Sequence, residues 1–449
     1  MASDWKEVAL GEIFNVKHGF AFKGEFFTDE QQPTILVTPG NFAIGGGFQN
    51  PKPKYYKGQI PKDYVLKPGQ IIVTMTDLSK QADTLGYTAI VPEDGNIWLH
   101  NQRIGLLEFK GSFPCDPIFI NYLLRSHRYR SWIIGSASGT TVKHTSPSRI
   151  HSFRCSVPPL PEQRAIAHIL GSLDDKIELN RQMNKTLEAT ARAIFKSWFV
   201  DFDPVRAKSE GRPTGLPDDI AALFPDSFED SELGEIPKGW RKGSLGDVCF
   251  VKGGFAYKSK DFQDKGFPVI KIKNINSDKT VDVYDVQFIP EEIAEATKTF
   301  WLNTGDLLMA MTGATVGKFG LIVNRETKPC LLNQRVAKFY PIESISNKIW
   351  FAYCNLCQSQ VLEHIINVAH GSAQPNISAK SIMETPIIFP KEQLIKVFDN
   401  TVNSLFKKML RNQSMCRTLA SLRDTLLPKL ISGKLRVPDA EKFLEEAGV

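Results

Sequence analysis

Short apolar runs separated by glycine, proline and polar residues recur in two long parts of the chain. Runs of this kind are typical of buried strands, whereas an apolar residue at every third or fourth position indicates a helix. We therefore predict strands at 34–37, 70–75, 87–91, 306–311 and 319–323. The stretches 118–134 and 349–366 predict helices. Together these elements predict an α+β fold built from mixed sheets with helices.

Each of these parts is followed by apolar positions at alternating steps of four and three residues, over 166–198 and 402–430. This spacing is a heptad seam and predicts two long spacer helices that pair with each other. A helix face packed on its own domain would give the same pattern, but a helix of about 40 residues spans about 60 Å, more than such a domain needs. The seam residues expected to set pairing and register are Leu173, Ile177, Asn180, Leu187, Leu405, Met409, Asn412 and Leu419.

The two parts are copies of one unit. Residues 5–23 and 240–258 are identical at 9 of 19 positions without a gap, and LHNQR at 99–103 corresponds to LLNQR at 331–335. We divide the chain into a first domain (1–159), spacer helix 1 (160–200), an acidic linker rich in proline and glycine (201–239), a second domain (240–390), spacer helix 2 (391–437) and a tail (438–449). The apolar segment 220–224 predicts that the linker docks at least once.

Composition narrows the class of protein. The chain has 449 residues, 42% hydrophobic and 23% charged, which is typical of soluble globular proteins. It lacks a long apolar run and a signal-peptide pattern at its start, so we expect a cytoplasmic protein without a membrane segment. Seven cysteines without regular spacing predict reduced, mostly buried thiols.

Charge is unevenly distributed. The net charge is +6, yet residues 201–240 carry ten acidic and four basic residues, so the rest of the chain carries +12. A positive field over two bodies suits a polyanionic partner, and ordinary solubilising surface charge is the alternative.

The candidates for chemistry fail. The stretch 311–320 resembles a phosphate-binding loop, but only three residues separate Gly313 from Gly317 and Phe319 replaces the required Ser or Thr. An acidic pair plus lysine at 91–94 and 108–110 is absent from the second copy. Cys354 and Cys357 lack a second pair at zinc spacing. We expect no catalytic site, no metal and no cofactor bound by this chain.

The motifs now identify a resemblance. LPEQRAIAHILGSLDDKIELNRQ (160–182), IFKSWFVDFDPVRAK (194–208), LGEIPKGW (233–240), MTGATVGKFG (311–320), LLNQRV (331–336) and LLPKLISGKL (426–435) resemble the specificity subunits of type I restriction-modification systems. The first copy departs from the pattern, because it lacks the GEIPKGW lead and its loop at 74–87 is longer.

The resemblance implies two target-recognition domains and long helices that pair as an antiparallel coiled coil. It also implies a non-catalytic subunit that binds a bipartite, asymmetric site in double-stranded DNA, one half per domain. Its partners would be two methyltransferase subunits that use S-adenosylmethionine to modify adenine, and restriction (translocase) subunits that use ATP and Mg²⁺. A free-standing DNA-modifying enzyme and a duplicated protein-binding scaffold are the alternatives.

Basic and polar residues in the expected loops are candidates for DNA contact. The candidates are Lys17, Lys23, Thr76, Arg103, Thr140, Thr141 and Lys143 in the first copy, and Lys252, Lys258, Arg335, Gln374, Asn376 and Lys380 in the second. For the two arginines the alternative is a buried structural pair with Asn101 and Asn333. Residues 403–437 hold eight basic residues and one acid, which predicts a helix that faces DNA phosphates or an acidic methyltransferase surface.

Overall fold

The computed structural model describes residues 4–50, 52–79, 81–140, 142–232, 234–325, 328–370 and 375–446. The chain forms two compact units: unit 1 is Met1–Ile177 with Thr418–Val449, and unit 2 is Glu178–Arg417. Each unit therefore holds one globular domain and a part of each long helix. The predicted domain boundaries stay a prediction, since this division follows contacts and cuts through both helices.

Unit 1 is built on two four-stranded sheets. The first is antiparallel, in the order β2 (Phe14–His18), β10 (Ile104–Phe109), β6 (Ile71–Thr74) and β8 (Thr88–Ile90). The second has the order β3 (Phe27–Thr28), β5 (Tyr55–Tyr56), β4 (Thr34–Val37) and β9 (Ile97–His100), with β4 and β9 parallel. Their apolar faces share one core, which includes Ile35, Trp98 and Ile72. The predicted α+β class is therefore correct.

Smaller elements complete unit 1. Strand β1 (Lys6–Ala9) pairs with β12 (Arg154–Val157), and β7 (Thr76–Asp77) pairs with β11 (Lys143–His144). The helices are α1 (Leu10–Ile13), α2 (Pro117–Leu123), α3 (His127–Gly135) and α4 (Pro147–His151). The helical stretch predicted over 118–134 is helical but forms two helices: Ser126 caps a new helix by accepting from the backbone N–H of Tyr129 (3.4 Å), so α2 and α3 are separate.

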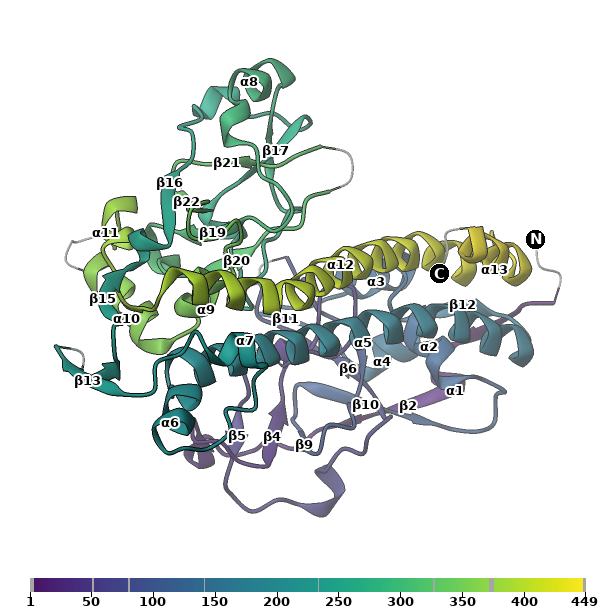
Figure 1. Ribbon diagram of the computed structural model, residues 1–449. Helices are drawn as coiled ribbons and strands as arrows, with labels where there is room; N and C mark the ends of the chain where they lie inside the picture. The colour runs from purple at the N-terminus through teal and green to yellow at the C-terminus, as the bar shows by residue number, and fades with distance from the viewer. Residues whose placement is uncertain are drawn as a thin grey trace. The chain divides into compact units, whose positions relative to one another are not determined.

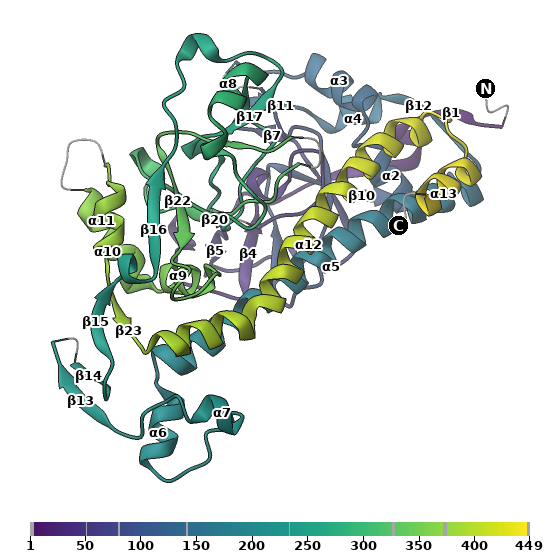
Figure 2. The ribbon, with the colours of Figure 1, turned by 45° about the horizontal axis from the view of Figure 1, so that its top comes forward.

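Unit 2 repeats this topology. Its main antiparallel sheet has the order β16 (Cys249–Gly253), β22 (Val336–Pro341), β19 (Leu307–Ala310) and β20 (Phe319–Leu321). Figure 2 labels β16, β22 and β20 of this sheet. A three-stranded sheet has the order β18 (Gln287–Ile289), β17 (Phe267–Ile270) and β21 (Leu331–Leu332), again with a parallel pair, β17 with β21. Strand β15 (Arg241–Ser244) pairs with β23 (Pro386–Phe389) as β1 pairs with β12. The duplication seen in the sequence is thus a duplication of fold.

The helices of the second domain are α8 (Glu291–Ala296), α9 (Trp350–Leu356), α10 (Ser359–Ala369) and α11 (Ala379–Met383). Here too the helix predicted over 349–366 is two, α9 and α10, with a break at residues 357–358.

The linker folds onto unit 2. It forms α6 (Asp203–Ser209), α7 (Asp218–Ala221) and the hairpin β13 (Phe228–Ser231) with β14 (Gly234–Pro237). Phe224 is buried, and its ring lies 5.4 Å from that of Trp198. The predicted docking of 220–224 is confirmed, because this ring joins the core shared by the linker, the second domain and the end of the first long helix.

The long helices are α5 (Leu160–Phe199) and α12 (Glu392–Ile431), and α13 (Val437–Glu446) follows. In unit 1, Asp174 of α5 pairs with Arg423 of α12 (2.6 Å), and Glu162 of α5 pairs with Arg436, which lies beyond the end of α12 (3.7 Å). Later residues of one segment meet earlier residues of the other, so the two segments run antiparallel, and Figure 1 shows α5 and α12 side by side.

Unit 2 shows the same direction. Asn184 donates to the carbonyl of Met409 (3.1 Å) and accepts from Asn412 (2.9 Å), while Cys416 lies near Arg181. The predicted seam residues Leu173, Ile177, Asn180, Asn412 and Leu419 are buried, and Leu187, Leu405 and Met409 are half-buried. Leu405 and Met409 also pack against the core of the second domain, so the seam serves both pairing and domain packing.

Candidate nucleic-acid interface

Three segments leave the same edge of the main sheet in each unit. In unit 1 they are the loop after β2 (19–23), residues 75–77 after β6, which include β7, and the loop before β10 (101–103). Strand direction explains this, because β2 and β6 end at the edge where the antiparallel β10 begins. The loops therefore form one continuous surface.

Backbone hydrogen bonds join these loops in unit 1. The N–H of Phe20 donates to the backbone carbonyl of His100 (2.8 Å), and the N–H of Gln102 donates to the carbonyl of Phe20 (3.0 Å). The N–H of Met75 donates to the carbonyl of Arg103 (3.0 Å), and that of Thr145 to the carbonyl of Met75 (3.0 Å). A fourth segment, which begins with β11, thus completes the edge.

Unit 2 repeats this ladder of bonds. Each of these bonds runs from a backbone N–H to a backbone carbonyl: from Gln334 to Phe255 (2.9 Å), from Met311 to Arg335 (3.0 Å) and from Ile377 to Met311 (3.0 Å). An edge with the same four segments is therefore present twice.

A glycine is required in the first loop of each edge. A side chain at Gly19 would place its Cβ 2.0 Å from the carbonyl oxygen of Asn101, and one at Gly254 would lie 2.2 Å from that of Leu332. Only glycine allows this close approach, which brings Phe20 and Phe255 beside the NQR loops. Each phenylalanine is 38% exposed.

The structure brings most of the predicted cations to these edges. Arg103 and Arg335 are exposed, and the side-chain oxygens of Asn101 and Asn333 accept from the backbone N–H groups of these arginines (3.2 and 3.4 Å). The alternative of buried Arg–Asn pairs is therefore wrong. Lys23, Lys252 and Lys258 are also exposed, and Lys17 is half-buried with its ammonium 5.2 Å from the ring centre of Tyr64.

The remaining candidates lie on the fourth segment and beside it. Thr76 is buried, with its hydroxyl 3.1 Å from Nδ1 of His144, so it supports the edge from below. Thr140 and Asn376 are exposed, Lys143 is half-buried, and Lys380 lies 3.7 Å from Glu384. Thr141 and Gln374 lie outside the described residues.

Some residues of the edge were missed from the sequence. Phe20, Phe255, Gln102 and Gln334 stand at equivalent positions of the two edges. The signal was present, since all four lie in segments that the two copies share. In unit 1 a pocket of about 160 Å³ opens beside this edge, and Lys54, Arg103, Gln102, Asn101, Thr38, Pro39, Phe22 and Phe27 line it.

One carboxylate orders the long loop at 74–87. Asp77 accepts from the backbone N–H of Ser79 (2.6 Å) and from the hydroxyl of Thr84 (2.7 Å). Burial works against ionisation of Asp77, but these hydrogen bonds outweigh it and lower the pKa of its carboxyl. The extra length of this loop is thus folded over a charged anchor.

His100 supports the edge as a neutral group. It is fully buried, its Nε2 lies 2.9 Å from the carbonyl oxygen of Ile104, and burial lowers its pKa to about 4. The histidine therefore adds no positive charge to the edge near pH 7.

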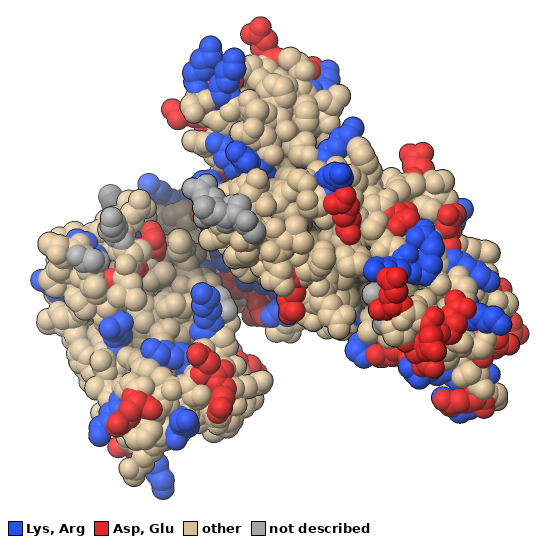
Figure 3. Space-filling view, turned by 90° about the vertical axis from the view of Figure 1, so that its left-hand side faces the viewer, with Lys and Arg blue, Asp and Glu red and all other residues tan. Residues whose placement is uncertain are grey.

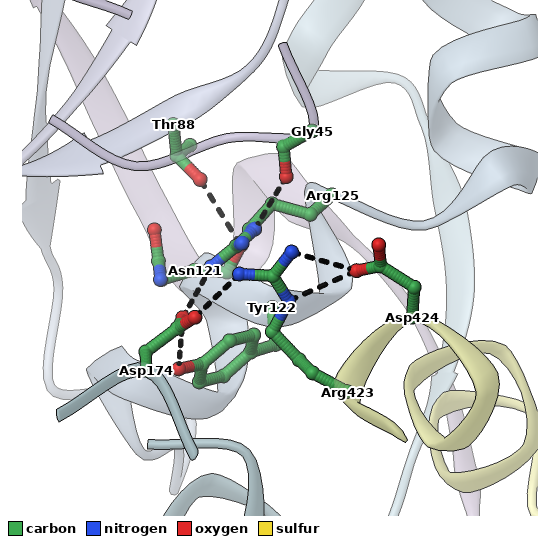
Figure 4. Close-up of polar contacts among 8 residues, drawn as sticks. All are labelled: Gly45, Thr88, Asn121, Tyr122, Arg125, Asp174, Arg423 and Asp424. Atoms are coloured by element: carbon green, nitrogen blue, oxygen red, sulfur yellow. Dashed lines mark hydrogen bonds and ion pairs between the residues drawn. The ribbon is translucent and has the colours of Figure 1, made fainter. Parts of the chain in front are cut away.

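A polar cluster fixes the first domain to the helices (Figure 4). Asp174 of α5 accepts from the hydroxyl of Tyr122 (2.8 Å) and from the guanidinium groups of Arg125 (2.9 Å) and Arg423 (2.6 Å). Burial opposes its charge, but the two arginines outweigh burial and lower the pKa of Asp174. Arg125 also donates to the carbonyl of Gly45 (2.7 Å), so the cluster reaches the sheet region.

Unit 2 has a corresponding cluster around Glu188. This residue of α5 accepts from the hydroxyl of Tyr353 (3.2 Å) and pairs with Lys279 (2.7 Å). The heptad pattern did not predict which residues of α5 form these two clusters.

The basic stretch 403–437 does not face one partner as a whole. Arg423 and Arg436 make the ion pairs described above, and Arg417 donates to the carbonyls of Val281 and Val323. These three cations therefore bind groups of this chain, and the partner faced by the remaining cations of the helix stays a prediction. Lys407, Lys408 and Arg411 remain exposed.

The rejected chemistry finds no new support. Burial raises the pKa of Cys354 well above its usual value and that of Cys357 to about 12, so neither thiol is a ready ligand or nucleophile. Among the described residues no three His, Cys, Asp or Glu side chains gather closely enough to hold a metal. Over the same part of the chain, every helix is too short or too polar to span a bilayer.

On the face shown in Figure 3, basic and acidic side chains are interspersed over a largely uncharged surface. Among the described residues on this face, no large area of one charge sign stands out.

The comparison with known proteins finds a family match in each of the two copies. The sequence profile described as "Type I restriction modification DNA specificity domain" matches residues 2–189 and 237–404. The chain is 28% identical to the type I restriction enzyme HindI specificity subunit of Haemophilus influenzae, over 96% of this chain and 100% of that protein. It is 26% identical to the MjaIX specificity subunit of Methanocaldococcus jannaschii, over 79% of this chain and 76% of that protein.

The fold is also similar to a solved structure. The crystal structure of the type I restriction-modification S subunit from M. genitalium matches with a TM-score of 0.56 and 18% identity, covering 95% of this chain and 96% of that one.

Proposed function

Because the chain belongs to the type I restriction-modification DNA specificity family, we propose that each unit reads one half of a bipartite site in double-stranded DNA. The chain is the specificity subunit of such a system and serves recognition rather than catalysis. The observation that carries the proposal is the edge present in both units, where an exposed arginine, a glutamine and an exposed phenylalanine occupy equivalent places. Arginine and glutamine are residue types that bind phosphates and base edges.

The two half-sites should differ in sequence. The shared residues of the edges suit contacts common to both halves, such as phosphates. The loop after β6 differs, because Asp77 folds a long loop in unit 1 whereas Gly313–Thr315 forms a short turn in unit 2. Different loops at equivalent places favour an asymmetric site.

The partners follow from the family. We propose assembly with two methyltransferase subunits that use S-adenosylmethionine to modify adenine, and with restriction subunits that use ATP and Mg²⁺. These cofactors belong to the partners in this proposal. The subunit would direct either reaction to its DNA site.

The arginines test the proposal. Methylation mapping in cells that carry the complete system first defines the site. Arg103→Gln and Arg335→Gln should each weaken binding of the purified complex to a duplex with that site by about tenfold or more, since a good arginine contact contributes about 1–3 kcal/mol. Lys67→Gln is the matched control, because Lys67 is exposed at the opposite end of β6. Unchanged affinity in both arginine variants would contradict the proposal.

The paired helices are proposed as the ruler between the half-sites. Four residues inserted after Leu187 lengthen α5 by about 6 Å, nearly two base-pair steps. The gap between the half-sites should grow while each half keeps its sequence. Intact binding with an unchanged gap, measured by methylation mapping, would rule out this role for α5.

The exposed cations of α12 have two proposed partners, unread DNA or the methyltransferase. Replacing Lys407, Lys408 and Arg411 with Gln should lower the slope of log affinity against log salt by up to about 0.9 per lost contact if they meet phosphates. Weaker assembly with an unchanged slope would assign them to the methyltransferase. No change in either property would mean that the three residues only solvate the helix.

A further inference from the structure

The two units hold a lysine over the same ring from different chain positions. In unit 1 the ammonium of Lys54 lies 4.2 Å from the ring centre of Phe27. In unit 2 the ammonium of Lys271 lies 3.7 Å from that of Phe262. Phe27 and Phe262 are equivalent, because each directly follows the short helix after the edge loop, η1 (Gly24–Phe26) or η5 (Ser259–Asp261).

The lysines themselves are not equivalent. Lys271 corresponds to Thr38, because each directly precedes a 3₁₀ turn, η6 (Ile272–Asn274) in unit 2 and η2 (Pro39–Asn41) in unit 1. The backbone N–H of Lys271 donates to the side chain of Asn274 (2.9 Å), and that of Thr38 donates to the side chain of Asn41 (2.8 Å).

Lys54 in turn corresponds to Gln287. In unit 1 the residue after Lys54, Tyr55, pairs with Ile35, which lies three positions before Thr38. In unit 2 the residue after Gln287, Phe288, pairs with Pro268, which lies three positions before Lys271. The ammonium of Lys271 donates to Gln287, so the two positions are neighbours. Between the units, the lysine and its polar neighbour have exchanged places.

Such an exchange indicates that the position of the charge matters more than the residue that supplies it. The rings of Phe27 and Phe262 are half-buried, and a cation over a ring contributes between about 0.5 kcal/mol at an exposed site and about 2 kcal/mol at a desolvated one, which is a modest structural reason to keep the lysine. The surroundings of the lysine give a functional reason. Lys54 and Arg103 line the same pocket with Asn101, Gln102 and Thr38. None of the eight lining residues is acidic.

Unit 2 places the same groups together. The N–H of Asn333 donates to the carbonyl of Ile270 (3.2 Å), which brings the NQR loop beside Lys271. Burial and the charge of Lys273 lower the pKa of Lys271, so a bound anion would relieve an unfavourable field.

We propose that Lys54 and Lys271 are equivalent contacts to a DNA backbone phosphodiester, held beside Arg103 and Arg335 in the two units. The inference rests on the proposed function and adds residues that correspond in space but not in sequence. It predicts that the charge can be moved between the two positions of one unit without loss.

The experiment uses the full chain assembled with its methyltransferase and a fluorescent duplex that carries the mapped site. Lys54→Gln should lower the slope of log affinity against log salt by about 0.9, the value for one phosphate. Adding Thr38→Lys to Lys54→Gln converts unit 1 to the arrangement of unit 2 and should restore both slope and affinity. Lys67→Gln should leave the slope unchanged, and thermal melting should show each variant folded.

The reciprocal set in unit 2 is Lys271→Gln and the exchange Lys271→Thr with Gln287→Lys. An unchanged slope in the single variants, or a loss that the exchanged lysines do not restore in either unit, would overturn the inference. A wild-type complex that bound no duplex would contradict the proposed function itself, so the two failures are distinguishable.

Discussion

Each unit attaches its globular domain to the long helices through a carboxylate of α5, and the two carboxylates differ. In unit 1, Asp174 in the early part of α5 holds Tyr122 and two arginines. In unit 2, Glu188 in the later part of α5 holds Tyr353 and Lys279. Each domain is thereby tied to the helices by a tyrosine, an acid and at least one cation. The chemistry of attachment is repeated, but the position of the acid is not.

A second pair of residues shows a difference in charge. In unit 1, Gln163 of α5 accepts from the backbone N–H of Asp116 (2.8 Å) at the start of α2 and donates to the carbonyl of Pro158 (2.8 Å). In unit 2, Asp399 of α12 accepts from the N–H of Phe351 (2.7 Å) at the start of α9. The two contacts come from different positions, since Gln163 corresponds in sequence to Gln393 and not to Asp399. Of the two side chains, only the carboxyl of Asp399 responds to pH.

Breaking the attachment in one unit should have the largest effect. Asp174→Ala leaves Arg125, whose side chain is 3% exposed, without its carboxylate, and removal of one partner from a buried ion pair costs about 3–5 kcal/mol. Hydrogen exchange should accelerate in unit 1 while unit 2 keeps its protection.

Glu188→Ala is the matched variant and should loosen unit 2 in place of unit 1. Equal loss of protection in both units from either variant would show that the clusters do not act separately.

The carboxyl of Asp399 should make unit 2 sensitive to pH. Burial raises its pKa from 3.8 to about 6, so the folded unit binds more protons than the unfolded chain between these values. Stability therefore falls as pH rises from about 4 to 6, by up to about 3 kcal/mol.

Asp399→Asn should remove this loss and raise the melting temperature at pH 7 but not at pH 4, as measured by calorimetry. Gln163→Glu in unit 1 should introduce a loss of the same sign. An unchanged melting temperature of Asp399→Asn at pH 7 would mean that the buried carboxylate is already compensated.

The asparagine pair between α5 and α12 in unit 2 should have the smallest effect. Asn412→Leu leaves the side-chain oxygen of Asn184 without its donor and should cost about 1 kcal/mol. The double change of Asn184 and Asn412 to Leu should be less costly, because no polar group is then left without its partner. Hydrogen exchange of 178–199 and 392–417 measures both, and equal costs would argue against the pairing.

The sequence predicted what depends on periodicity and repetition. The heptads predicted both long helices, and the copies predicted that the NQR loop recurs. The partners across the seam could be identified only from the structure: Asn412 pairs with Asn184, which is not among the seam residues expected to set register. The break within 118–134 depends on a single capping serine.

The candidate interface was predicted in part for the same reason. Arg103 and Arg335 stand in matching motifs and could be found by comparing the copies. Lys54 and Lys271 stand at unmatched positions, so only the strand register reveals their shared place. The sequence did not identify Asp174 and Glu188 as attachment points, because their partners come from distant segments of the chain.

The central claim is that each unit reads its own half of the DNA site. Replacing residues 1–157, which end with β12, by the matching domain of a related specificity subunit tests it most directly. Methylation mapping in cells with the complete system should show one half-site changed and the other half unchanged. A change in both halves would contradict separate reading by the two units.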